Sequence, residues 1–260
     1  MKTKQLFKIT GVIFLFLGLI SCEKVIDLKL KTDEQRIVVE GYITKGETTH
    51  QVHITKTLNF NETAAYPPVE DAIVTIIDNE GNAGVFTHTG NGIYEIQGYA
   101  AVIGRTYTLK ILSGGVTYEA KSTMPSEVLL DDIFILTYDL GGTQVKVPIP
   151  LYVDIAGEKN YYLFEPSVNG EKKGGIRLLD DQYMDGLSNE RPVFISDLKV
   201  GDTLKIVMHC IDYNAYKYLF TLDQNTGSVA APANPESNFG NSALGYFSAR
   251  VTSEKKVIVQ

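Results

Sequence analysis

The sequence predicts a mainly β protein: an N-terminal antiparallel β-sandwich of immunoglobulin type, followed by a second β-rich domain with one packed helix. Between residues 36 and 124, short runs of alternating apolar and polar residues are separated by turns rich in glycine and small polar residues. No helical period interrupts these runs. Beyond residue 125 the runs are less regular, and one segment has the spacing of an amphipathic helix.

The N-terminus has the parts of a secretory signal. Residues 1–10 carry three lysines and no acid, and residues 11–20 are almost entirely apolar. An apolar run of about ten residues is too short to remain in a bilayer as a spanning helix, which needs about twenty. The following Leu19-Ile20-Ser21-Cys22 resembles the lipobox of bacterial lipoproteins. We therefore expect residues 1–21 to be removed as a lipoprotein signal peptide.

Cys22 is the predicted lipidation site, and residues 22–35 are the predicted tether. Two or three acyl chains on one cysteine hold a protein on a membrane firmly, whereas a single chain holds it only marginally. Glu23 follows the cysteine in place of the aspartate that retains lipoproteins at the inner membrane of enteric bacteria. This favours the outer membrane, and it leaves open whether the protein faces the periplasm or the cell exterior.

Composition argues against a nucleic-acid partner. Removal of the signal takes three of the 24 basic residues and none of the 31 acidic ones, so the net charge goes from −7 to −10. Nucleic-acid binding requires a basic face. With Cys22 used for lipid, Cys210 has no partner for a disulfide within the chain, and its apolar surroundings predict a buried thiol.

Seven strands are expected in the first domain, residues 36–124. Each run has a length typical of a strand, and the turns between them contain small polar residues or glycine. The predicted strands cover residues 37–43, 51–58, 72–77, 85–89, 92–96, 106–112 and 116–120.

The second domain, residues 125–260, is expected to contain further strands and a helix over about residues 212–225. Ile211, Ala215, Tyr218, Leu219 and Leu222 recur at helical spacing, with Asp212 or Asn214 available as the N-cap. The predicted strands cover residues 133–138, 144–155, 161–168, 176–179 and 203–211, and a final pair covers 246–252 and 256–259. Residues 230–242 are expected to form a long loop.

No catalytic residue, metal site or cofactor is predicted. His50 and His53 are three apart, a spacing that in a strand places them on opposite faces. The chain has no G-x-S-x-G motif and no glycine-rich phosphate loop before a helix. The acidic stretch 180–186 fails the EF-hand pattern, because Tyr183 and Pro192 stand at ligand positions. A pair of carboxylates for glycoside hydrolysis is recognised in space, so that alternative stays open.

A weak candidate for a contact surface surrounds the predicted helix. Tyrosine offers a broad apolar ring together with a polar hydroxyl, and an asparagine-rich loop follows the helix. The candidate residues are Tyr213, Tyr216, Tyr218, Asn234 and Asn238. The alternative for the tyrosines is that they cover the face of a sheet.

Several motifs resemble one known family. They include Val39-Glu40-Gly41-Tyr42-Ile43, Ser122-Thr123-Met124-Pro125 and, most specific, Ala243-Leu244-Gly245-Tyr246-Phe247-Ser248-Ala249. Together they are similar to the Bacteroidota lipoprotein family called domain of unknown function 4249, over essentially the whole mature chain. The resemblance implies a location in the cell envelope and, often, genes beside TonB-dependent outer-membrane receptors. The first domain is also similar to the transthyretin-like sandwiches found on such receptors. That family has no established catalytic residues to carry over.

Three functions remain as hypotheses. The leading one is a non-catalytic accessory of a TonB-dependent receptor, which helps to bind a small ligand of unknown identity or stabilises the receptor assembly. The second is an envelope hydrolase acting on glycan or peptide. The third is a structural component of envelope assembly or secretion machinery.

Overall fold

The alternating runs of the first half form strands in the computed structural model, which describes residues 35–59, 62–226 and 235–260. In β2, for example, His50, Val52 and Ile54 are buried whereas Gln51 and His53 are exposed. The seven strands of this half are β1 (Ile37–Thr44), β2 (Thr49–Lys56), β3 (Ile73–Asp78), β4 (Ala83–Gly90), β5 (Ile93–Gln97), β6 (Thr106–Ser113) and β7 (Val116–Thr123).

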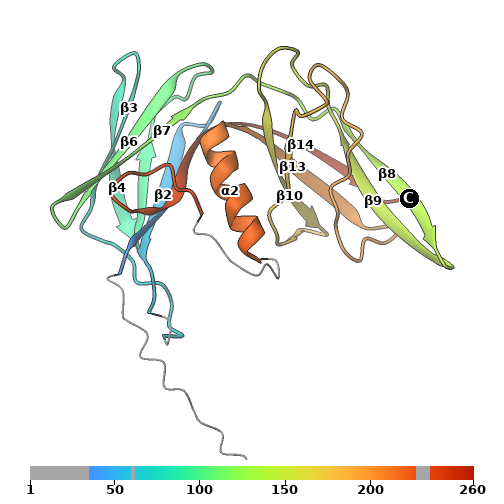
Figure 1. The fold of residues 1–260 in the computed structure, drawn as a ribbon, viewed down its shortest axis with the longest axis horizontal. Helices are drawn as coiled ribbons and strands as arrows, with labels where there is room; N and C mark the ends of the chain where they lie inside the picture. The colour runs from blue at the N-terminus through green and yellow to red at the C-terminus, as the bar shows by residue number, and fades with distance from the viewer. Residues whose placement is uncertain (1–34, 60–61, 227–234) are drawn as a thin grey trace, which may run out of the picture. The chain divides into compact units, whose positions relative to one another are not determined.

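The second half is also mainly β and contains the expected helix. Its strands are β8 (Asp132–Leu140), β9 (Thr143–Leu151), β10 (Tyr161–Val168), β11 (Glu171–Lys172), β12 (Leu178–Asp180), β13 (Thr203–Ile211) and β14 (Leu244–Ile258). The helix α2 (Tyr213–Thr226) lies against β10, β12 and β14 (Figure 1). The mainly β fold class with one packed helix is therefore confirmed.

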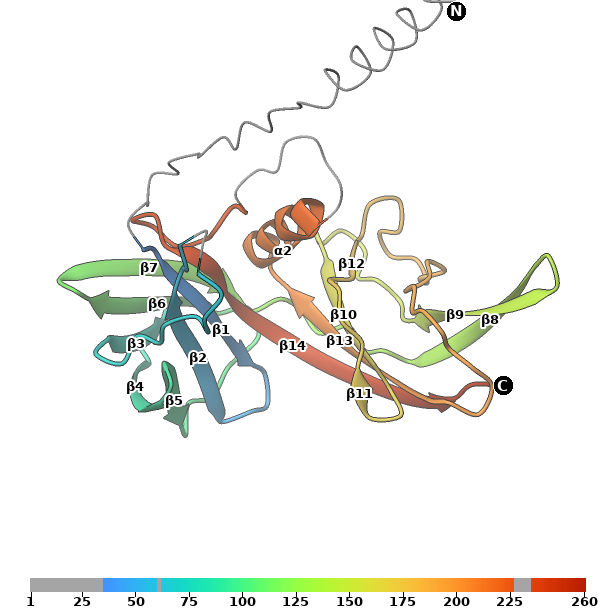
Figure 2. The same ribbon diagram turned by 90° about the horizontal axis from the view of Figure 1, so that it is seen from below.

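One long strand, β14, belongs to both halves. Its first part, Leu244–Arg250, pairs in parallel with β1. Its second part, Val251–Ile258, pairs antiparallel with β13. The hydrogen-bonded order is therefore continuous, β11-β10-β13-β14-β1-β2-β5-β4-β3-β6-β7. Figure 2 shows β14 running from β1 to β13 without interruption.

The expectation of two strands at residues 246–252 and 256–259 was wrong. The polar residues Ser253-Glu254-Lys255 looked like a turn, but they continue the pairing with β13. Glu254 and Lys255 are exposed, and Glu254 forms an ion pair with Lys205 of β13 at 2.6 Å. Successive side chains of a strand point to opposite faces, so both faces of β14 are exposed here and accept polar residues without a turn.

The first sandwich also uses residues from outside 36–124. The amide of Ala249 donates to Ser122 Oγ at 2.7 Å, which joins β14 to β7. An isolated antiparallel β-bridge between Ala120 of β7 and Phe239, which precedes β14, is a second contact with β7. The expected sandwich is thus completed by β14, which pairs in parallel with β1.

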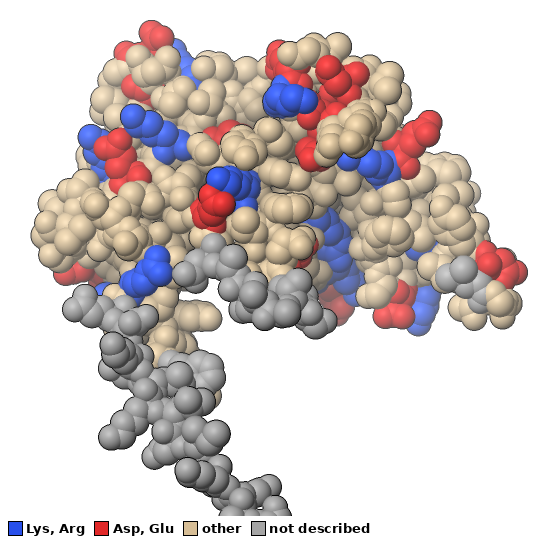
Figure 3. All heavy atoms as spheres, in the orientation of Figure 1, with Lys and Arg blue, Asp and Glu red and all other residues tan. Residues whose placement is uncertain are grey.

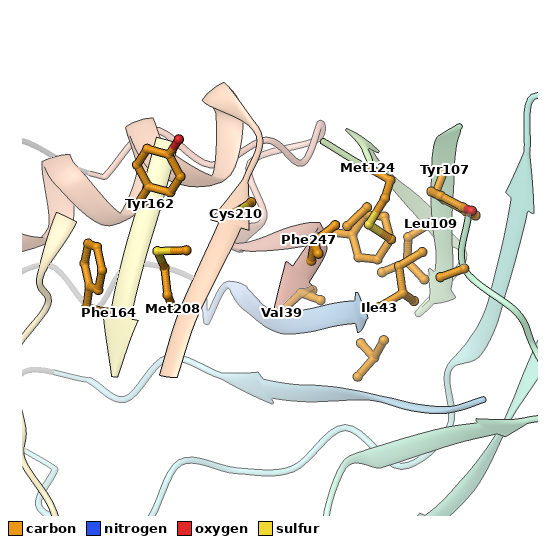
Figure 4. Packing of buried hydrophobic residues seen from close by; sticks show 14 of the residues in the cluster. Val39, Ile43, Tyr107, Leu109, Met124, Tyr162, Phe164, Met208, Cys210 and Phe247 are labelled. Atoms are coloured by element: carbon orange, nitrogen blue, oxygen red, sulfur yellow. The ribbon is translucent and has the colours of Figure 1, made fainter. Parts of the chain in front are cut away.

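A single apolar core runs through both halves. It contains Leu109 and Ile43 of the first half, Phe247 of β14, and Met208 and Phe164 of the second half. Figure 4 shows these side chains as one continuous layer. The hairpin β8-β9 packs on the same core through Ile133. The expected boundary between residues 124 and 125 therefore does not separate two units, because the described residues all lie in one compact unit, Glu34–Gln260.

Gly245 permits the close approach of β1 and β14. Its φ angle is +92°, and a Cβ atom at this position would lie 1.8 Å from the carbonyl oxygen of Val39. Only glycine adopts this conformation readily and leaves that space empty.

Within the described part of the chain, no helix has both the length and the apolar character needed to cross a bilayer.

Candidate binding groove beside the helix

Helix α2 begins where the sequence predicts. Asp212 Oδ1 accepts a hydrogen bond from the amide of Ala215 at 2.9 Å, which is the geometry of an N-cap. Its Oδ2 accepts from the amide of Thr123 at 3.1 Å, so the cap also ties the helix to the end of β7. Burial raises the pKa of Asp212.

The inner face of α2 covers the sheet. Ala215, Tyr218 and Leu219 form a small core with Leu163 of β10 and Ile211 of β13. These helix positions are three and four residues apart, so they lie on one side. The opposite side of the helix remains available for other contacts.

A row of aromatic rings follows the outer side of α2. Tyr161 of β10 lies 5.5 Å from Tyr213 and 4.7 Å from Tyr216, measured between ring centroids. Tyr216 stacks on Phe220 with centroids 5.8 Å apart. Aromatic pairs at these separations contribute about 0.5–1.5 kcal/mol beyond the area that they bury. The rings are therefore held in place relative to one another.

A groove of about 430 Å³ opens beside this row. Ligand pockets typically have volumes of about 300–1,000 Å³. Phe194, which is 71% exposed, forms part of the wall opposite the helix. The complete lining is Gly175, Ile176, Arg177, Leu178, Leu179, Pro192, Val193, Phe194, Tyr216, Phe220 and Asp223.

The polar groups around the groove hold its walls together. Arg177 Nε donates to the carbonyl of Phe194 at 2.9 Å, and Arg177 Nη1 donates to the carbonyl of Gly175 at 3.0 Å. The hydroxyl of Tyr216 donates to Asp180 Oδ2 at 3.2 Å. Burial, together with the nearby charge of Asp180, raises the pKa of Tyr216 to about 12, so the phenol stays neutral. The groove offers ring faces and apolar side chains to a ligand.

The predicted contact residues have different positions. Tyr216 lines the groove, and Tyr213 is exposed beside it. Tyr218 is buried on the inner face and stacks on Tyr246 at 5.3 Å. The Asn238 side chain exchanges hydrogen bonds with the backbone of Phe247 at 2.8 and 3.0 Å, so it closes the edge of β14. Asn234 and Cys22 lie outside the described residues.

The sequence reasoning missed Phe194, Phe220 and Arg177. Phe194 belongs to an irregular segment with no periodic pattern. Phe220 follows Tyr216 by four residues, and that helical spacing was a signal that could have identified it. Arg177 was not identifiable, because its role depends on backbone carbonyls that only the fold brings together.

The groups that could perform chemistry are mostly inert. Burial raises the pKa of Cys210 to about 12, which keeps the thiol protonated. Burial also lowers the pKa of His50, whose Nε2 lies 2.9 Å from the carbonyl oxygen of Tyr99. Among the described residues, no group of three or more His, Cys, Asp or Glu side chains has the arrangement of a metal site.

One histidine lies beside a carboxylate. His209 Nδ1 is 2.9 Å from Thr252 Oγ1, and Nε2 is 3.4 Å from Glu165 Oε2. The second contact does not have hydrogen-bond geometry, so Nε2 has no hydrogen-bond partner among the described residues. Burial lowers the pKa of His209, whereas the nearby imidazole lowers that of Glu165.

Charged side chains are scattered over the face of the molecule that carries α2. Figure 3 shows basic and acidic residues interspersed across this face, with much uncharged surface between them. The surface feature that distinguishes this face is therefore the aromatic groove, because the charged side chains in this view form no broad patch of one charge.

The comparisons with known proteins give one family. The model of the family described as "Domain of unknown function (DUF4249)" matches residues 23–256. The search of curated proteins found no match. Among solved structures, a two fibronectin type-III domain segment from chicken tenascin is similar over 86% of this chain and 100% of that chain, at 10% identity and a TM-score of 0.22. At this TM-score the likeness says nothing about fold or function.

Proposed function

This chain belongs to the family of domain of unknown function 4249, and from that premise we propose that it is a non-catalytic outer-membrane lipoprotein serving as an accessory binding or scaffold subunit of a TonB-dependent receptor system. The location follows from the lipobox at Cys22 and from the absence of an aspartate after it. The receptor as partner follows from the resemblance to Bacteroidota lipoproteins. The observation that supports a binding role is the aromatic groove beside α2.

The groove suits binding better than catalysis. Its rings are ordered by mutual packing, and its one arginine is hydrogen-bonded to backbone carbonyls. A site of this composition recognises a ligand or a partner side chain by apolar contact and shape. Phe194 and Phe220 are the exposed anchors, and aromatic residues of this kind often dominate the energetics of an interface.

The direct test is affinity capture from gently solubilised outer membranes, with partners identified by mass spectrometry. We expect the tagged wild-type chain to retain a TonB-dependent receptor in stoichiometric amount, and we expect the Phe194→Ser and Phe220→Ser variants to lose it. Val85→Ser is the matched control, because Val85 is a comparably exposed apolar residue on β4, in the other half. Capture of a barrel that imports nothing would favour the structural-component hypothesis, and absence of any stable partner would contradict both complex-based functions.

The anchoring is tested separately. We expect the Cys22→Ser variant to lose incorporation of a labelled fatty acid and to appear in the aqueous fraction after membrane separation. Wild-type protein that remains in the aqueous fraction would contradict the lipoprotein assignment without affecting the groove.

A second function, envelope hydrolysis, is favoured by one observation. Thr252, His209 and Glu165 form a line of hydroxyl, imidazole and carboxylate. Such an order is that of a nucleophile, a base and an orienting acid. However, His209 is only 2% exposed, which limits access to the imidazole. Hydrolysis of an activated ester by the wild type, lost in Thr252→Val and in His209→Gln, would establish this function in place of the proposed one.

A further inference from the structure

The face of β14 that points away from the main core is polar although much of it is buried. Alternate residues of a strand point to the same side, so Tyr246, Ser248, Arg250 and Thr252 share this face. Ser248 and Arg250 are buried, and Arg250 is only 9% exposed. None of these residues lines the groove beside α2.

Arg250 has donors that the described part of the protein does not use. Its Nε donates to Thr44 Oγ1 at 3.3 Å, and its Cζ lies 3.4 Å from the ring centroid of Tyr42. No carboxylate of the described residues is within ion-pair distance of its guanidinium, and its terminal nitrogens make no hydrogen bond to them. A guanidinium is always charged and carries five N–H donors. These nitrogens are not among the buried polar atoms without a partner, so they reach solvent and can bind an acceptor from outside the described residues.

Two further buried polar atoms on this face have no hydrogen-bond partner in the described structure. They are Ser248 Oγ and His209 Nε2. Buried polar atoms without partners are uncommon in native proteins. Their position beside Arg250, whose terminal nitrogens reach solvent, indicates that an additional group completes the site.

The strand register brings these groups into one row. Tyr42 pairs with Ser248, and Thr44 pairs with Arg250. Because the guanidinium of Arg250 stacks on Tyr42, it points along the strand toward Ser248. His209 pairs with Thr252, on the other side of Arg250. Side chains two residues apart on a strand are separated by about 7 Å, so Arg250 lies between the two unused groups.

The charges nearby select the kind of anion. Glu165 lies 3.4 Å from His209, and Glu40 pairs with Tyr246 one rung beyond Ser248. These acids oppose any anion, and they oppose a group with two negative charges more strongly than a group with one. A carboxylate carries one charge, and its planar pair of oxygens matches the guanidinium fork.

The same surroundings provide aromatic contacts. Tyr42 is 40% exposed while its ring covers the guanidinium, and the stacked pair of Tyr246 and Tyr218 occupies the next rung. A ligand with an apolar or aromatic body attached to its carboxylate would contact both. We propose that Arg250, assisted by the hydroxyl of Ser248, forms a binding site for the carboxylate of a small organic ligand, with Tyr42 at its rim.

Calorimetric titration of the full chain in detergent tests this site with three probes. Benzoate carries the carboxylate and an aromatic body, benzamide has the same shape without the charge, and inorganic phosphate supplies a different anion. We expect saturable binding of benzoate, with benzamide and phosphate at least tenfold weaker. Equal binding of benzoate and benzamide, tighter binding of phosphate, or no binding of benzoate at millimolar concentration would overturn the proposal.

Variants locate the site on the molecule. Arg250→Gln should weaken benzoate binding at least tenfold. Lys205→Gln is the matched control, because it removes one positive charge from the same sheet face, where Lys205 is already paired with Glu254. An equal loss in the control would show non-specific charge attraction and would overturn the assignment.

Ser248→Ala keeps the test decisive if Arg250→Gln fails to fold. The Ser248 hydroxyl has no partner to lose among the described residues, so this variant should fold normally. We expect it to weaken benzoate binding about threefold while leaving the weak binding of benzamide unchanged. Unchanged affinity for benzoate in the folded variant would show that Ser248 does not belong to the site. If the wild type also bound benzoate and benzamide equally, the whole proposal would be wrong.

Discussion

The two faces of β14 have opposite characters. On one face, Phe247, Ala249 and Val251 are all buried in the core that both halves share. On the other face, Ser248 is 1% exposed and its hydroxyl is buried without a partner among the described residues. Arg250 is 9% exposed, and its terminal nitrogens reach solvent without a hydrogen bond to those residues. The first face stabilises the fold by excluding water. The second face leaves a buried hydroxyl without a hydrogen bond, which lowers the stability of the fold. Departures of this kind are expected at functional sites.

This comparison is tested most strongly at Phe247. Replacement of a fully buried phenylalanine by alanine costs about 3–5 kcal/mol of unfolding free energy. Because Phe247 belongs to the core of both halves, we expect Phe247→Ala to destabilise the whole unit in a single transition. Chemical denaturation followed by circular dichroism measures the effect. Ile258→Ala, at a 65% exposed position of the same strand, is the control and should change the free energy by no more than about 0.5 kcal/mol.

The next largest effect is expected at Gly245. An alanine Cβ would collide with the backbone of Val39, and the positive φ angle adds strain of about 1–3 kcal/mol. Gly245→Ala should therefore lower the free energy of unfolding by about 3 kcal/mol in total, mainly by separating β14 from β1. Gly240→Ala is the matched control, since a Cβ there meets no atom within 4 Å. Equal stability of the two variants would contradict the close approach of the strands.

The polar face should make stability depend on pH. Burial lowers the pKa of His209, and it also lowers that of His50 in the first half. The unfolded chain binds these protons near the ordinary pKa of about 6.5, whereas the folded chain resists them. Stability should therefore be greatest above about pH 6.5 and should fall as the pH decreases below that value. Denaturation midpoints between pH 8 and pH 5 measure the slope.

His209→Gln separates the two histidines in this experiment. The variant should have a shallower dependence on pH than the wild type, and the double variant with His50→Gln should be shallower still. A wild type whose stability rises on acidification would contradict the buried neutral state of these imidazoles.

The smallest effect concerns Ser248. Ser248→Ala removes a buried hydroxyl without a partner, so the desolvation cost of that group disappears. We expect a gain of up to about 1 kcal/mol in the free energy of unfolding, while the affinity for benzoate falls. A loss of stability of that size would show that the hydroxyl contributes to the fold, and the contrast between the faces of β14 would then be weaker.

The sequence predicted most elements but not their assembly. All seven strands of the first half were expected, because each buries alternate residues and ends in a turn. The N-cap at Asp212 was also recognisable, since a capping residue acts on its own helix. By contrast, the polar residues 253–255 concealed the continuity of β14, whose partners are more than 40 residues away in β13 and about 200 residues away in β1.

The candidate contact residues also include some whose positions local spacing indicates and some whose positions depend on the fold. Tyr216 lines the groove beside the helix, whereas Tyr218 lies on the inner face with Ala215 and Leu219. Helical spacing contained that information, because residues three and four apart share a side. Asn238 was expected in a contact surface, but it satisfies the backbone of Phe247, and no local pattern shows which backbone amides lack partners.

The sequence by itself determined most of the strands, the helix and its cap, because these depend on alternation, helical spacing and turn chemistry within a few residues. Only the tertiary structure decided that β14 joins β1 to β13 and that the two halves share one core. It also decided that Arg250 is buried against Tyr42 with its terminal nitrogens unused by the described residues. The physical reason is that strand pairing and the burial of charge depend on residues far apart in the chain, and their free energies are fixed only when those residues meet.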